Sequence, residues 1–121
     1  MSYKPLSYYG NAKKISRMEA QFREWQQEYI QQTIEAPYVP FLVGVNCIAM
    51  VDLDYHKTLE DALAIARNCG YDRVAKLNPL GAKKLHTHFT HLATAGLESA
   101  FHGGVDAVWD LNGNLLNNNT Y

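Results

Sequence analysis

The chain has 121 residues, which is enough for one hydrophobic core but not for two. Hydrophobic residues make up 47% and charged residues 19%, a composition that excludes a disordered tail. The formal net charge of −1 disfavours nucleic acid as a partner, because a protein that binds the phosphate backbone carries a clear basic excess.

The start of the chain and its two cysteines bear on the compartment. The first residues lack the basic-then-apolar pattern of a signal peptide, and the longest apolar run is too short to span a bilayer. Cys47 and Cys69 stand in apolar surroundings with no metal or redox spacing, so we expect buried free thiols, which suit a reducing compartment. The sequence therefore predicts a cytoplasmic protein without a membrane partner.

The N-terminal third divides into an arm and a helix. Residues 1–10 hold three tyrosines, a proline and a glycine without any period, which indicates an extended arm ahead of a single domain at 11–121. From Asn11 to Ala36 apolar residues recur at spacings of three and four, which predicts a long helix that ends before Pro37. The residues of this stripe are Ile15, Met18, Phe22, Trp25 and Tyr29.

The aromatic stripe has two interpretations. It packs on the protein's own sheet, or it is the contact surface for another protein or for a second copy of the chain. Trp and Tyr dominate the energetics of protein interfaces, which favours a contact role. However, fewer than three heptads are too short for a stable coiled coil that rests on helix pairing alone.

The middle of the chain predicts a β–α–β unit. Residues 41–53 form an apolar, β-branched run that predicts one central strand ending in Asp52 and Asp54. Thr58 starts a short capped helix that Gly70 closes, and residues 71–77 predict the next strand. The following Asn-Pro-Leu-Gly predicts a type I turn.

The end of the chain predicts a β-hairpin. Its arms are residues 105–111 and 114–117, joined by Asn112-Gly113 in a type I′ turn, which needs φ > 0 at both central residues. The fold class expected is α+β: one domain in which a long N-terminal helix and one or two shorter helices pack on a small mixed sheet ending in this hairpin.

Four of the five histidines lie close together in the sequence. Residues 82–102 predict a helix with a kink or an early end at Gly96, but a strand over 85–94 stays open, because Leu85-His-Thr-His-Phe alternates. A metal site needs three or four converging ligands, and the chain has neither a His-Glu-x-x-His run nor paired cysteines of zinc spacing. We therefore expect no metal and no cofactor; a metal, if present, would be held by His86, His88, His91 and His102.

Two His-x-Thr triplets suggest an enzymatic alternative. They begin at His56 and His88, and in these triplets the chain resembles a phosphoesterase superfamily that cleaves cyclic or 2′,5′ phosphate linkages. The resemblance implies a hydrolase or phosphoesterase, possibly metal-dependent. Its catalytic groups would be a histidine of the cluster, His88 or His91, with an acid from Asp52 and Asp54, which point the same way at a strand end.

No nucleophile elbow, phosphate-binding glycine loop or dinucleotide motif occurs in the sequence. The function predicted from sequence is therefore that of a small non-enzymatic protein-binding or regulatory protein, of the inhibitor or adaptor kind. It would act through the aromatic helix face on another protein or on itself. The alternative is the hydrolase that uses the histidine cluster.

Overall fold

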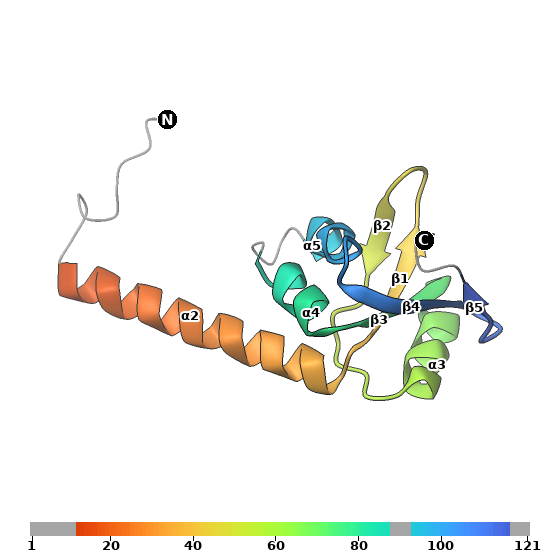
Figure 1. Ribbon diagram of the computed structural model, residues 1–121, viewed down its shortest axis with the longest axis horizontal. Coiled ribbons are helices and arrows are strands. Elements are labelled where there is room, and N and C mark those ends of the chain that lie inside the picture. Colours follow the sequence, from red (N-terminus) through yellow and green to blue (C-terminus); the bar gives the residue numbers. More distant parts are fainter. Residues whose placement is uncertain (1–11, 88–92, 117–121) are drawn as a thin grey trace.

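The computed structural model describes residues 12–87 and 93–116, so the predicted arm at residues 1–10 lies outside the described part. Figure 1 shows the elements in chain order. They are α2 (Ala12–Glu35), β1 (Tyr38–Val43), β2 (Ile48–Val51), α3 (Leu59–Cys69), β3 (Arg73–Leu77), α4 (Pro79–Leu85), α5 (Ala93–Ala100), β4 (Val105–Asp110) and β5 (Leu115–Leu116).

The five strands form one sheet in the order β2-β1-β3-β4-β5. Helix α3 covers one face of this sheet, and α4 and α5 cover the other (Figure 1). The predicted α+β class, the long first helix and the C-terminal hairpin are confirmed. The described part has three shorter helices where one or two were expected, because the segment predicted as one helix over 82–102 contributes α5 and most of α4.

The sheet is antiparallel in each named strand pair of the described residues, not mixed as expected. The reason lies in β1, which pairs antiparallel with β2 on one side and with β3 on the other. The strands β2 and β3 therefore run in the same direction with β1 between them. The predicted β–α–β unit exists as β2–α3–β3, but it is split by the inserted strand.

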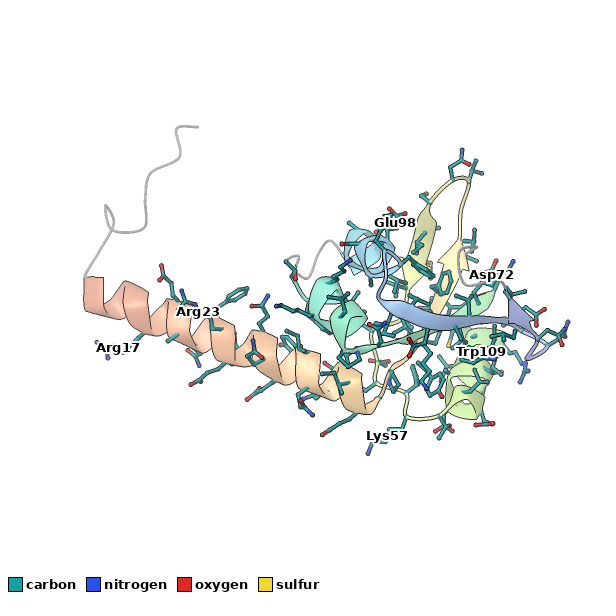
Figure 2. The ribbon with its side chains drawn as sticks, viewed as in Figure 1. Arg17, Arg23, Lys57, Asp72, Glu98 and Trp109 are labelled. Atoms are coloured by element: carbon teal, nitrogen blue, oxygen red, sulfur yellow. The ribbon has the colours of Figure 1, made fainter. Side chains whose placement is uncertain are left out.

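The apolar run at 41–53 is a hairpin and not the single strand expected. The chain reverses at residues 44–47, where Asn46 has φ of 62° and the Gly44 amide donates to the Cys47 carbonyl at 2.7 Å. Two carboxylates hold the hairpin to the rest of the domain (Figure 2). Asp72 accepts the Val43 amide at 3.1 Å, and Glu98 of α5 accepts the Ile48 amide at 2.7 Å. A run of apolar residues carries too little information to locate this reversal.

Capping residues set the ends of α3 and α4. Thr58 accepts the Asp61 amide at the start of α3 and Gly70 closes the helix with φ of 85°, as predicted. The predicted Asn-Pro-Leu-Gly turn is instead the first turn of α4, because the Asn78 side chain accepts the Gly81 amide and Pro79 fits the first helical turn. α4 ends at Leu85, and residues 88–92, which the helix and strand interpretations contested, lie outside the described part.

Two hydrophobic clusters lie on the two faces of the sheet. The cluster under α4 and α5 is centred on fully buried Phe41, Leu97 and Val108. The cluster under α3 includes Val74, with Trp109 packed against it. Alternation along each strand explains this division, since neighbouring residues of a strand point to opposite faces. The two thiols belong to neither cluster: Cys47 and Cys69 are both exposed, and not buried as expected, because they lie in a hairpin turn and in the last turn of a helix.

The C-terminal hairpin has a three-residue loop instead of the predicted two-residue turn. The Asp110 amide donates to the Asn114 carbonyl at 3.0 Å, and only Gly113 of the loop has positive φ, at 80°. The Asp110 carboxylate causes the difference, because it accepts the backbone amides of Asn112 and Asn114 and so folds the loop over its own side chain. This is a type I turn followed by a left-handed glycine, in which Asn112 needs no positive φ.

Candidate docking surface

Among the described residues, the hydrogen bonds and ring contacts that join helix α2 to the body of the protein (β1 to β5 with α3, α4 and α5) come from the C-terminal half of the helix. In Figure 1 its N-terminal half extends away from the sheet and from the three other helices of the described part. The attachment is to α4 and the residue that follows it, His86. None of the described helices is both long and apolar enough to cross a bilayer.

The attachment is built around His86. Its backbone carbonyl accepts the side-chain amide of Gln26 at 2.7 Å, and its ring stacks on Tyr29 with centroids 5.8 Å apart. Its Nε2 lies 2.7 Å from the hydroxyl oxygen of Thr33, which is only 3% exposed. One residue of the body therefore holds three successive turns of α2.

The hydrogen bonds of Thr33 fix the tautomer of His86. The hydroxyl has one proton, which it donates to the Tyr29 carbonyl at 2.9 Å. Its oxygen must then accept a proton from Nε2 of His86, so the neutral ring carries its proton on Nε2. Burial lowers the pKa of His86 below its ordinary value, which keeps the ring neutral at physiological pH.

The predicted aromatic stripe is exposed where α2 leaves the body. Phe22 is 43% exposed, Trp25 48% and Tyr29 42%, and Tyr29 also stacks on the ring of His86. The helical spacing places Ile15 and Met18 on the same face of the backbone, while their side chains lie outside the described part. Phe22, Trp25 and Tyr29 thus each keep nearly half of their surface in water.

The charges of α2 are arranged against its own dipole. Its first turn has no acidic residue and its last turn no basic one. Its N-terminal half holds basic residues at 13, 14, 17 and 23 and one glutamate at 19, whereas its C-terminal half holds glutamates at 24, 28 and 35 and no basic residue. Arg17 and Arg23 project from the helix outside the layers of the body (Figure 2). Since a helix is stabilised by the opposite distribution, this pattern is unfavourable for an isolated helix.

The predicted metal set is not assembled in the described residues. His86 uses its ring to hold α2, whereas His102 lies exposed in the turn after α5. His88 and His91 lie outside the described part. No group of three or more His, Cys, Asp or Glu side chains that could hold a metal ion occurs among the described residues.

Asp52 meets a histidine that sequence reasoning had not paired with it. Nε2 of His56 lies 3.4 Å from Asp52 Oδ2, while Asp52 Oδ1 accepts the Asp54 amide at 2.8 Å. His56 is largely buried, and its carbonyl accepts the amide of Tyr38. Burial, and then the charge of Asp52, raise the pKa of Tyr71. In the sequence the two residues are four positions apart. Outside a helix this spacing does not predict a contact, so the sequence contains no usable signal for the pair.

Protein-family models, curated proteins and solved structures yield no match to this chain. The function therefore has to be inferred from its own residues. Two features of the described part carry chemistry: the exposed aromatic face of α2 and the Asp52–His56 pair.

Proposed function

We propose that this protein works by docking on other protein surfaces, as an adaptor or regulatory module, and that the aromatic face of α2 is its contact surface. The observation that carries the proposal is the exposure of Phe22, Trp25 and Tyr29 on one face of a helix that projects from the body. A large aromatic side chain carries roughly 150–250 Å² of surface, so leaving several in water forfeits a substantial hydrophobic free energy. A partner that covers them recovers it.

The body supports this role by presenting the helix. His86 fixes the C-terminal turns of α2 through Gln26, Tyr29 and Thr33. Because its C-terminal turns are fixed, α2 is already folded there, and the direction in which its N-terminal turns leave the body is set. Presenting a preformed helix lowers the conformational entropy lost on association, which favours a helix-in-groove or helix-on-helix contact.

The proposal is tested with Trp25→Ala, and Gln27→Ala on the other side of the same helix is the matched control. Association is measured by light scattering of the purified protein and by quantitative capture of its partner from the native host. An interface tryptophan contributes about 2 kcal/mol or more, so we expect about a 30-fold weakening for Trp25→Ala and no change for Gln27→Ala. If Trp25→Ala lowers only the melting temperature, the face belongs to the protein's own core and the docking role is wrong.

A second candidate function rests on the Asp52–His56 pair. A carboxylate that orients an imidazole is the minimal arrangement for general base catalysis, which supports a hydrolase or phosphoesterase. Its histidine is His56, whereas sequence analysis joined His88 or His91, which lie outside the described residues, to an acid from Asp52 and Asp54. The purified protein is assayed with a chromogenic phosphodiester. This candidate requires turnover that His56→Asn abolishes while circular dichroism stays unchanged; absence of turnover in the unmodified protein rejects it.

A further inference from the structure

We infer that the docking surface of α2 continues onto the loop between β2 and α3, and that its partner is a basic segment of another protein, with arginine or lysine beside apolar side chains. This inference rests on the proposed docking function and names the chemistry of the partner. The aromatic part of the surface is formed by Trp25 and Tyr29 of α2 and by Tyr55 of the loop. An acidic flank of α2 lies beside it.

The loop between β2 and α3 lies beside the C-terminal end of α2. His56 of this loop forms isolated β-bridges with Pro37 and Tyr38, which closely follow the last residue of α2. The carbonyl of His56 accepts the Tyr38 amide at 3.3 Å. Tyr55, the neighbour of His56 in the chain, therefore stands next to the point where α2 joins the body.

The exposed aromatic side chains of α2 and of this loop form one surface. Trp25 and Tyr29 are four residues apart on the helix, so they share a face. Tyr55 is 43% exposed, about as much as Tyr29. Burial, and then the charge that Tyr29 carries when deprotonated, raise the pKa of Tyr55, so the two phenols lie within electrostatic reach of each other. The aromatic face of the helix thus extends onto the body.

One flank of the C-terminal half of α2 is acidic. Glu24, Glu28 and Glu35 follow one another at spacings of four and seven residues, which places them along a single side of the helix. All three are exposed. Arg17 lies on the same side two turns before Glu24, and Arg23 lies on the far side of the helix from the aromatic face. From Glu24 to the end of α2 the charges on this flank are therefore all carboxylates.

The acidic flank lies beside Trp25, on the side away from the attachment to the body. At 3.6 residues per turn, Gln26 and Thr33 lie to one side of Trp25 and the glutamates to the other. Gln26 and Thr33 are the residues that bind His86 of the body. A partner that covers Trp25 therefore also reaches the carboxylates without displacing this attachment.

The acidic flank is unfavourable for the helix on its own. Glu24 and Glu28 are like charges four residues apart, and they lie in the half of α2 whose end carries the negative pole of the helix dipole. Cations of a partner beside them remove both unfavourable terms. Nucleic acid or an anionic lipid surface would add to them. Charge thus selects a basic partner.

Arginine and lysine suit both parts of the surface. Their aliphatic stems cover apolar surface while the charged heads stay in water, and their cations are attracted to the faces of Trp and Tyr rings. Exposed ion pairs with the glutamates contribute little affinity each, so the rings set the affinity and the charges set the choice of partner. The loop adds less charge than the helix, because Lys57 offsets one of its two aspartates.

Peptide selection tests the chemistry of the partner. A library of random peptides displayed on phage is selected on the immobilised full chain, and peptides that also bind Trp25→Ala are set aside. We expect the remaining peptides to be enriched in arginine and lysine and depleted in aspartate and glutamate, relative to the unselected library. The net charge of the chain is only −1, so nonspecific attraction does not predict this enrichment.

Two double variants with the same change in net charge locate the cations of the peptide. Glu24→Gln/Glu28→Gln removes two carboxylates beside Trp25, whereas Glu19→Gln/Glu60→Gln removes two exposed carboxylates on the other side of α2 and on α3. In fluorescence anisotropy we expect about fivefold weaker binding of a selected peptide for the first variant and less than about twofold for the second. The first variant also removes a like-charge pair, so the helix stays folded, which circular dichroism checks.

Tyr55→Ala tests whether the surface extends onto the body. We expect the selected peptide to bind about tenfold more weakly, with thermal unfolding as the check that the body remains folded. Unchanged peptide binding by Tyr55→Ala confines the surface to α2 and overturns its continuation onto the loop.

The remaining outcomes separate the basic partner from the docking role. Selected peptides that depend on Trp25 but are neutral or acidic, or equal weakening by the two double variants, overturn the basic partner and leave the docking role intact. If no selected peptide depends on Trp25, the basic partner is also wrong. Light scattering then distinguishes a second copy, seen as a dimer that Trp25→Ala dissociates, from loss of the docking role, seen as a monomer.

Discussion

The body and the projecting half of α2 use the same kinds of side chain and treat them differently. In the body Phe41 and Leu97 are fully buried between sheet and helices, while in α2 Phe22 and Trp25 keep nearly half of their surface in water. The difference does not come from composition. Phe41 and Leu97 lie between the sheet and its helices, whereas no sheet face lies against the first turns of α2 (Figure 1).

An amphipathic stripe can face either the protein's own sheet or solvent. A 3.6-residue apolar period indicates that one face of a helix is suited to be covered, but it does not identify the covering element. In α3 the cover is the protein's own sheet, since Ala62, Leu63 and Ala66 are buried. In α2 the same kind of period extends beyond the body.

The largest effect is expected from truncating the core under α4 and α5. Phe41 is fully buried, packs edge-on against Phe101 at 5.4 Å between ring centroids, and lies on β1, which pairs with a strand on each side. Phe41→Ala removes these contacts and leaves a cavity, so we expect a loss of about 3–5 kcal/mol in urea unfolding. A loss below about 1 kcal/mol would show that the body is loosely packed and would remove the contrast with α2.

A smaller effect is expected in the C-terminal hairpin. Gly113 has φ of 80°, a conformation that a β-branched residue adopts with strain, so Gly113→Val should destabilise the protein by about 1–3 kcal/mol. The change is measured by thermal unfolding. Asn112 is the matched control, because its exposed side chain and negative φ predict a change within about 0.5 kcal/mol for Asn112→Ala. If both substitutions lower the free energy of unfolding equally, the two-residue turn predicted from sequence describes the hairpin better than the three-residue loop.

Local signals in the sequence predicted the elements that depend on local chemistry. The period of α2, the Thr58 cap and the Gly70 end of α3 need only neighbouring residues, and all three are confirmed. The turn at 44–47 and the antiparallel order of the sheet depend on distant partners, such as Glu98 against Ile48. A linear pattern contains no information on those contacts, so these predictions were wrong.

The candidate sites divide in the same way. Exposure of the predicted face at Phe22, Trp25 and Tyr29 follows from where α2 leaves the body, which only the structure gives. The approach of His56 to Asp52 depends on the loop between β2 and α3, where no period applies. The anchoring role of His86 was hidden because its partner Thr33 is 53 residues away in the chain.

The next prediction concerns the boundary between the two regions, at His86. Burial lowers its folded-state pKa, so between that value and the ordinary 6.5 the unfolded chain binds more protons than the folded one. Stability therefore falls as the pH drops below about 6.5, and this part of the loss should be absent in His86→Asn, which stays neutral. Melting temperatures of both proteins at pH 7.5 and 5.5 measure it. If the melting temperature falls by the same amount in both proteins between pH 7.5 and 5.5, protonation of His86 does not cause the loss.

The smallest effect on folding is expected from Trp25→Ala, measured below the concentration at which the protein associates. Trp25 is 48% exposed, and alanine has the higher helix propensity by about 0.5 kcal/mol, so the lost packing and the gained propensity nearly cancel. We expect a change within about 0.5 kcal/mol in urea unfolding.

The same substitution in the body is the control for Trp25→Ala. Trp109 packs against the cluster under α3 and lies 5.8 Å from Tyr38 between ring centroids (Figure 2), so Trp109→Ala should cost about 2 kcal/mol or more. Trp25→Ala keeps Trp109 as a fluorescence probe of the body, and Trp109→Ala keeps Trp25 as a probe of α2. If the two losses are equal, Trp25 is a core residue of the single chain. If only Trp109→Ala destabilises the fold, Trp25 adds little to folding, and the free energy of covering it remains for a partner.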